Sequence, residues 1–155
     1  MPKVSAGLLM YRVCGGQVEV LLVHPGGPLF RNKDDGAWSI PKGEPEPGED
    51  LLATAQREFH EETGLAPTGP LLPLSPITQK GGKVVHAWAF AGDCDPAAIV
   101  SNTFDMEWPP HSGRQATFPE IDRAEFFALD QARRKIKPAQ SPLIDELAAM
   151  LRAKA

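Results

Sequence analysis

The sequence predicts an α/β fold, in which one domain over residues 1–155 forms an α/β/α sandwich with a mixed β-sheet between helices. Its length of 155 residues is a common size for a single domain. Strand-like and helix-like segments alternate in mixed order, and no repeat or linker divides the chain. With 42% hydrophobic and 23% charged residues, the composition is that of an ordinary globular domain.

The first two strands are expected at Val4–Val13 and Val18–His24, which are apolar and rich in β-branched residues. Gly15–Gly16 between them is typical of a tight hairpin turn. Residues 24–50 are dominated by glycine, proline and charge, with a brief extended segment at Trp38–Ile40. A loop of this length within a small domain indicates a functional surface.

A helix is predicted over Leu51–Thr63. Asp50 is a suitable N-cap, and Gly64 supplies the left-handed conformation that ends many helices. The apolar residues of this segment share one face at helical spacing, and they are Leu51, Leu52, Ala55 and Phe59.

The rest of the chain continues the mixed pattern. Further strands are expected at 70–78, irregular and interrupted by prolines, at 83–93, at 102–110 and at 125–129. Phe104, Met106 and Trp108 alternate in the third of these. A short helix is expected from Asp130 to Ile136, and a final helix starts at Ser141–Pro142 and bears the apolar stripe Leu143, Leu147, Met150 and Leu151.

Composition excludes several classes of partner. The formal net charge is −4 and there is no long basic run, which argues against a surface for duplex nucleic acid. No apolar run approaches the about 18 residues that a membrane span needs, and the N-terminal segment lacks the apolar core of a signal peptide. We therefore expect a cytoplasmic protein in which Cys14 and Cys94 are reduced thiols.

Three glutamates of the predicted helix form an acidic patch. Glu58, Glu61 and Glu62 stand at i, i+3 and i+4, so their carboxylates share one side of the helix beside the apolar stripe. At about 6 Å and an effective dielectric of about 20, two carboxylates repel by roughly 3 kcal/mol. A solvated acidic face relieved by Arg57 is one interpretation. The other is a site for a hard divalent cation, Mg²⁺ or Mn²⁺.

A longer pattern favours the cation site. Gly43, five residues, Glu49, seven residues and then Arg57 to Leu65 give G-x5-E-x7-R-E-U-x-E-E-x-G-U, where U is a bulky apolar residue. This pattern resembles the Nudix box without a departure. The resemblance implies a Nudix-type α/β/α sandwich across most of the chain. It also implies a divalent-metal-dependent hydrolase that cleaves a phosphoanhydride bond in substrates built on a nucleoside diphosphate.

The same resemblance implies roles for the residues of the box. Glu58 and Glu62 would be the principal metal ligands, with Glu61 as a further ligand, directly or through water, and the backbone carbonyl of Gly43 as another. Arg57 would orient the glutamates, and Glu49 would pair with it. The alternative for Glu49 is a surface residue near a helix start.

The general base is left open by the sequence, because the family draws it either from the box or from a downstream loop. Glu58 is the candidate in the box. Glu120, just before an apparent strand, is the downstream candidate, and it competes with Glu107, Asp122 and Glu125. An ordinary loop acid is the alternative for each of the downstream residues.

The segment WSIPKGE, Trp38–Glu44, narrows the substrate class. It resembles the corresponding segment of diadenosine polyphosphate hydrolases and of enzymes that act on diphosphoinositol phosphates. Lys42 is suited to bind a phosphate, because Gly43 permits close approach. Candidates for contacts to a longer phosphate chain are Arg31, Lys33 and Arg114, with Lys80 and Lys83. Each alone is better explained as an ordinary surface cation, and only their meeting around one cleft would favour binding.

Aromatic residues give a weaker signal. Trp38 is the candidate for stacking on a base, whereas Trp88 and Trp108, which alternate within strands, are better explained as core residues. One feature departs from the diadenosine polyphosphate hydrolases, which often carry a tyrosine downstream of the box. Here Gly81, Gly82 and Lys83 stand there, and the single tyrosine is Tyr11.

The preferred function is therefore hydrolysis of a small-molecule nucleoside polyphosphate, with dinucleoside polyphosphates favoured. The alternatives are another Nudix substrate, such as an oxidised nucleoside triphosphate, ADP-ribose, a nucleotide sugar or an inositol pyrophosphate, and a non-catalytic module that binds a nucleotide. Recognition of the substrate depends on loops outside the box, so the sequence separates these poorly. It predicts no oligomeric state.

Overall fold

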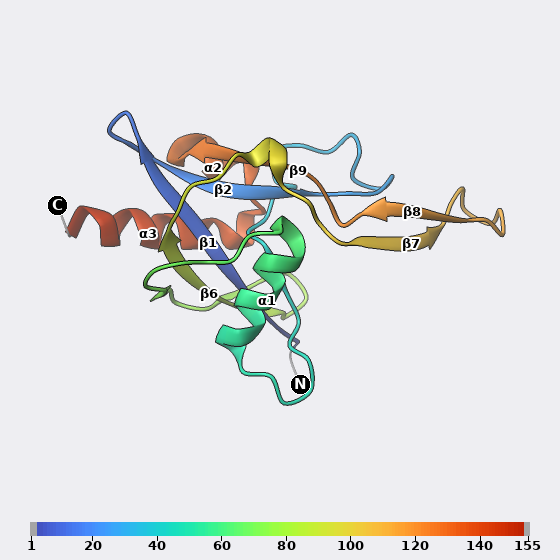
Figure 1. Cartoon of the computed structure of the whole chain (residues 1–155), viewed down its shortest axis with the longest axis horizontal. Coiled ribbons are helices and arrows are strands. Elements are labelled where there is room, and N and C mark those ends of the chain that lie inside the picture. Colours follow the sequence, from blue (N-terminus) through green and yellow to red (C-terminus); the bar gives the residue numbers. More distant parts are fainter. Residues whose placement is uncertain (1–2, 154–155) are drawn as a thin grey trace.

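The computed structural model describes residues 3–153 and has the predicted three-layer architecture, with a mixed sheet between helices (Figure 1). The five strands of the main path are β1 (Val4–Cys14), β2 (Gln17–Pro25), β4 (Leu72–Pro73), β6 (Val84–Ala91) and β9 (Ile121–Ala128). Their order is β4-β6-β1-β2-β9, while β3 (Lys42–Gly43) pairs with β1 and β5 (Ile77–Thr78) pairs with β6. Strands β1 and β6 run parallel and the other pairs are antiparallel.

Strand β1 shares one of its edges between two partners. Tyr11–Cys14 pair with β2, whereas Ala6 and Gly7 pair with Gly43 and Lys42 of β3. A Cβ added to Gly7 would lie 2.4 Å from the carbonyl oxygen of Pro41, so only glycine lets the two segments approach this closely. This close packing fixes β3 on the sheet beneath the following helix.

The helices divide between the two faces of the sheet. Helix α1 (Leu51–Thr63) packs one face through Ala55 and Phe59, in a buried cluster with alternate residues of β1. Helices α2 (Leu129–Lys135) and α3 (Ser141–Ala153) cover the other face. Short 3-10 helices η1 (Pro96–Ala98) and η2 (Pro138–Gln140) complete the fold.

Both ends of α1 follow the prediction. The Asp50 carboxylate accepts a hydrogen bond from the backbone N–H of Ala53 at 2.8 Å. Gly64 adopts φ 77° and its N–H donates to the carbonyl of His60 at 2.7 Å. The glutamates of the helix are therefore held on a well-defined frame.

The region after β6 differs from the prediction. Strand β7 (Thr103–Glu107) does not join the main sheet but pairs with β8 (Gln115–Pro119), a strand that the sequence analysis missed. The β7–β8 hairpin projects from the body of the domain (Figure 1). Trp108 lies beyond the end of β7 and is partly exposed, so assigning it to the core was wrong, whereas Trp88 packs against the cluster under α1.

Two further predictions concern single features. Cys14 and Cys94 are free cysteines, as expected. Within residues 3–153, no helix has the length and apolar character that crossing a membrane requires.

Candidate active site

The acidic patch of α1 lies against β3. Glu62 is 7% exposed and the Glu58 side chain 14% exposed, while Glu61 is more open. A Cβ added to Gly43 would lie 2.1 Å from the carboxyl carbon of Glu58. The glycine therefore makes room for the Glu58 carboxylate directly against the strand backbone, which brings two of the predicted metal ligands together.

Arg57 organises the surrounding acids. Its guanidinium donates two hydrogen bonds to Glu49, from Nε at 2.8 Å and from Nη2 at 2.9 Å. Nη1 donates to Glu58 at 3.0 Å and to Glu61 at 3.1 and 3.2 Å. Nη2 also donates to the carbonyl of Glu44, which ties the loop to the helix at 3.1 Å. The expected pairing of Glu49 with Arg57 is present.

Burial and crowding perturb the carboxylates. The pKa of Glu62 is raised to about 9, first by burial and then by the charge of Glu58, with Lys42 opposing the rise. The pKa of Glu58 is raised by burial and by the charge of Glu61. Glu120 contributes to both increases, so this exposed acid faces the same patch. The charge of Glu120 therefore acts on both Glu58 and Glu62.

The cluster suits a hard divalent cation. Among residues 3–153, no three His, Cys, Asp or Glu side chains are placed so that they could together hold a metal ion, and the carboxylates of Glu58 and Glu61 form ion pairs with Arg57. Glu62, however, is a buried acid to which no residue of the described chain makes an ion pair. An all-oxygen donor set of this kind fits Mg²⁺ or Mn²⁺ better than softer metals.

A cationic pocket of about 140 Å³ opens beside Glu62. Lys42 and Lys137 line it together with Pro25, Ser39 and Ile121. The pKa of Lys42 is lowered to about 8, first by burial and then by the nearby charges of Lys137 and Lys83. Positive charge therefore gathers next to the acidic cluster, as binding of a phosphate chain requires.

Lys137 was missed by the sequence analysis. It follows α2, far from the box in the sequence, and its N–H donates to the carbonyl of Trp38 at 2.8 Å. That hydrogen bond joins the segment after α2 to the loop that precedes β3. No sequence signal distinguishes Lys137 from other surface lysines, because its position depends on a contact across about 100 residues.

Trp38 does not lie where base stacking requires. It is 1% exposed, belongs to the core cluster under α2 and α3, and packs edge-on against Phe127 at 5.0 Å between ring centroids. Its Nε1 donates to Asp34 at 2.8 Å. Assigning Trp38 to substrate binding was wrong, because an alternating apolar pattern around it directs the ring inward.

The other predicted cations lie at different distances from the patch. Arg31 and Lys33 are exposed in the loop after β2, and Lys83 lies 3.9 Å from Glu44. Arg114 is exposed in the loop at the tip of the β7–β8 hairpin, which projects away from α1 (Figure 1). The structure therefore does not bring Arg114 to the acidic cluster.

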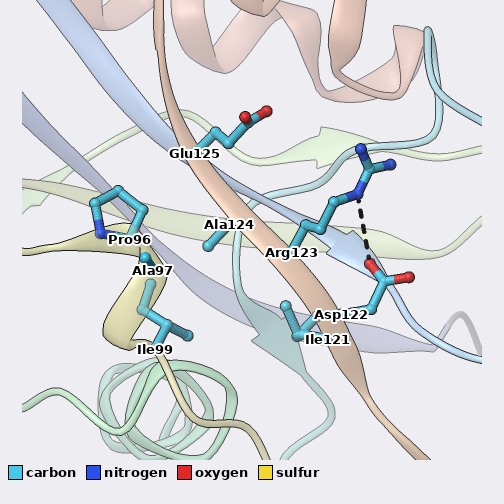
Figure 2. A pocket seen from close by; sticks show the side chains of 8 residues that line it. All are labelled: Pro96, Ala97, Ile99, Ile121, Asp122, Arg123, Ala124 and Glu125. Atoms are coloured by element: carbon cyan, nitrogen blue, oxygen red, sulfur yellow. Dashed lines mark ion pairs between the residues drawn. The ribbon is translucent and has the colours of Figure 1, made fainter.

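The competing downstream acids have structural partners. Glu107 accepts hydrogen bonds from the N–H groups of His111 and Gly113 and so closes the hairpin tip. Asp122 contacts Nδ1 of the buried His24 at 2.7 Å. Asp122 and Glu125 line a separate pocket of about 220 Å³ between β9 and η1, which contains neither Glu58 nor Lys42 (Figure 2). Glu120 is the downstream acid that faces the box.

Comparisons with known proteins identify the family and the fold of the chain. The NUDIX domain family matches residues 1–147. An RNA pyrophosphohydrolase of Roseobacter denitrificans is 43% identical over 63 residues, which are 38% of this chain and 38% of that protein. The asymmetrical bis(5'-nucleosyl)-tetraphosphatase of Caenorhabditis elegans is 38% identical over 61 residues, or 39% and 40% of the two chains. The matches thus span about two fifths of these relatives.

Solved structures match over nearly the whole length. The Ap4A hydrolase of C. elegans, in a binary complex, has a TM-score of 0.66 and 24% identity, and the match covers 97% of this chain and 98% of that one. The NUDIX domain of Shewanella oneidensis NrtR, complexed with ADP ribose, also has a TM-score of 0.66, at 16% identity, with 97% and 89% covered. These likenesses establish the fold. The family match over residues 1–147 shows that the chain belongs to the NUDIX domain family.

Proposed function

We propose that this protein is a Mg²⁺- or Mn²⁺-dependent hydrolase that cleaves a phosphoanhydride bond in a nucleoside polyphosphate, with dinucleoside polyphosphates the favoured substrates. The observation that carries the proposal is the contact between an acidic cluster and a cationic pocket. Glu58 and Glu62 lie on one side, and Lys42 and Lys137 on the other. The family generally uses divalent metal ions, in keeping with this acidic cluster.

The residues of the cluster have distinct roles in this proposal. Glu58, Glu62 and Glu61, with the carbonyl of Gly43, would hold the cations. When bound, these neutralise the substrate's phosphates and polarise its phosphorus–oxygen bonds. Arg57 keeps Glu58 in place through the hydrogen bond at 3.0 Å. Lys42 and Lys137 bind phosphate oxygens that project into their pocket.

Two acids remain candidates for the general base. Glu58 is held against Gly43 and Arg57, whereas the side chain of Glu120 is exposed to solvent. Either carboxylate would accept the proton of the attacking water. Glu58→Gln should lower turnover by about 10³-fold or more, because it removes both a ligand charge and a candidate base. Glu120→Gln should lower turnover less if Glu120 only positions the water.

The two variants can be separated by their pH profiles. Loss of the acidic limb of the kcat profile in Glu120→Gln, but not in Glu58→Gln, would assign the base to Glu120. If turnover by Glu58→Gln stays within tenfold of the parent, the acidic cluster is not where the reaction occurs. Unchanged circular dichroism spectra would show that both variants are folded.

The substrate class rests on WSIPKGE and on the similarity to the nematode tetraphosphatase. A second candidate is pyrophosphate removal from the 5' end of RNA, favoured by the 43% identity to the Roseobacter protein. Hydrolysis assays in Mg²⁺ on a substrate panel would decide between these candidates. The panel contains diadenosine tetra- and hexaphosphate, 5'-triphosphate RNA, ADP-ribose and nucleoside triphosphates. Release of ATP from a diadenosine polyphosphate supports the proposal, and cleavage confined to RNA supports the second candidate.

Other properties belong to the same proposal. The chain would act as a single domain, and its partner would be a small-molecule nucleotide. It would act in the cytoplasm, where its two cysteines stay reduced. A protein that binds nucleotides in Mg²⁺ but hydrolyses no member of the panel would instead be a non-catalytic module. The intact set of box carboxylates argues against that outcome.

A further inference from the structure

An apolar pocket of about 120 Å³ lies between the loop after β2 and the β7–β8 hairpin. Residues 26–30 form one wall, and Phe104 and Met106 of β7 form the other. The two walls touch, since a Cβ added to Gly27 would lie 2.9 Å from Phe104 Cζ. The hairpin that the sequence did not predict thus supplies half of an apolar cavity.

The apolar pocket and the cationic pocket are lined by consecutive residues of the chain. Pro25 lines the pocket of Lys42 and Glu62, and the next residue, Gly26, lines the apolar pocket. The N–H of Gly26 also donates to the carbonyl of Glu120 at 2.8 Å, so the acid that faces the cluster lies beside both pockets.

The loop is held in place before any ligand arrives. Nε2 of His24 contacts the carbonyl of Lys33 at 2.6 Å. At the far end of the loop, Asp34 accepts the hydrogen bond from Trp38. Between these anchors, the Phe30 ring is 36% exposed and Leu29 is 62% exposed. Pre-ordered apolar groups of this kind bind ligands without the entropic cost of ordering a loop.

The charges around the loop complement a polyphosphate. Arg31 and Lys33 are exposed next to Phe30, and Lys33 Nζ lies 6.0 Å from the centroid of its ring. An apolar floor with a cationic rim, and a second cationic pocket lined by the neighbouring residue Pro25, match a ligand that has a flat apolar end and an anionic chain.

We propose that the apolar pocket between residues 26–30 and the β7–β8 hairpin binds the nucleobase of a nucleoside polyphosphate whose phosphates extend to Lys42 and Lys137. The inference rests on the proposed function and adds where the base is recognised. Trp38 is buried and cannot stack on a base, and the single tyrosine, Tyr11, packs against the core cluster on the other face of the sheet. Phe30 supplies the exposed ring in their place.

Phe30→Ala tests the inference by calorimetric titration in Mg²⁺ with two ligands, ATP and inorganic tripolyphosphate. The variant should bind ATP about tenfold more weakly, since stacking of one base on an aromatic ring is worth about 1–3 kcal/mol. Its affinity for tripolyphosphate, which has no base, should stay within twofold. Val13→Ala is the matched control, because Val13 is 65% exposed on the distant β1–β2 hairpin, and it should change neither affinity.

A second measurement uses the folded parent protein. With ¹³C-labelled methionine methyl groups, ATP should shift the Met106 signal through the ring current of the base, and tripolyphosphate should not. The chain has four methionines, so the variant Met106→Leu identifies the signal. This readout does not depend on how the pocket variants fold.

Several outcomes would overturn the inference. It fails if Phe30→Ala weakens ATP and tripolyphosphate equally, if it weakens neither, or if both ligands move the Met106 signal alike. Loss of a dimer in sedimentation of Phe30→Ala would show that the pocket is a contact between copies of the chain. If the parent protein binds neither ligand and hydrolyses nothing in the substrate panel, the proposed function fails first and this inference with it.

Discussion

Replacing Gly43 by alanine should lower the rate of hydrolysis strongly and the stability of the fold only slightly. The new Cβ would lie 2.1 Å from the Glu58 carboxyl carbon, whereas ordinary contact begins at 3.4 Å, so the carboxylate must move by about 3.4 − 2.1 = 1.3 Å. Because it is the end of a flexible side chain, moving it should cost only about 1 kcal/mol of folding stability. A misplacement of about 1 Å at a reacting centre, however, can lower the rate about 100-fold.

Gly7→Ala is the matched comparison. Its Cβ would lie 2.4 Å from the backbone oxygen of Pro41 and 2.7 Å from the Cβ of Lys42, which cannot move without shifting β3. Overpacking against backbone should cost about 1–3 kcal/mol, or roughly 3 to 9 °C in melting temperature for a chain of this size. Gly43→Ala should therefore melt close to the parent, and Gly7→Ala clearly below it.

Thermal melting and the steady-state release of ATP from diadenosine tetraphosphate in Mg²⁺ measure the two effects. The reasoning is refuted if Gly43→Ala keeps its kcat within threefold of the parent. It is also refuted if Gly43→Ala loses as much melting temperature as Gly7→Ala, because the loss of rate would then follow from a damaged fold.

Three other predictions concern charge. The folded protein keeps a proton on Glu62 up to a pKa of about 9, whereas the unfolded chain loses it near 4.5, so metal-free stability should fall as pH rises between these values. The melting temperature measured in EDTA should therefore fall from pH 5 to pH 9. Mg²⁺ displaces the proton from Glu62 and should reduce this fall. A melting temperature in EDTA that does not change with pH would contradict the raised pKa of Glu62. Arg57 lowers the pKa of Glu49 to about 2. The Glu49 carboxylate therefore stabilises the fold above pH 4.5, and this stabilisation is lost as pH falls to 2. In Glu49→Gln, the free energy of unfolding measured in urea should depend less on pH between 4.5 and 2. Lys137→Gln should raise the KM for a dinucleoside polyphosphate about tenfold with kcat within threefold, while Lys135→Gln, which removes an ion pair with Asp34, should leave KM unchanged.

Features encoded by neighbouring residues were predicted well from the sequence. Helix α1 has the expected bounds because Asp50 and Gly64 satisfy its ends locally. The pairing of Glu49 with Arg57 was also expected, since eight residues on a loop and a helix turn bring them together. The box acts as a local unit, and its pattern fixes the positions of the glutamates.

Features that depend on distant contacts were not predicted. Strand β8 has no strong apolar run, and the alternation of β7 does not say which strand will pair with it. The burial of Trp38 depends on Phe127, and the position of Lys137 depends on a hydrogen bond to Trp38. Nor does the sequence show that Phe30 and Met106 line one cavity. The pocket that we propose for the base therefore lies in the part of the fold that a single sequence describes least.

The guanidinium of Arg57 supplies three acids of the box with a counter-charge that does not depend on a bound cation. By bonding to Glu49, Glu58 and Glu61 together, it provides a built-in counter-charge while no cation is present. Small zinc domains, in contrast, unfold when their ion is withdrawn. Here a chelator should abolish hydrolysis without unfolding the protein. Adding the ion back should restore hydrolysis as fast as the ion binds, with no refolding step.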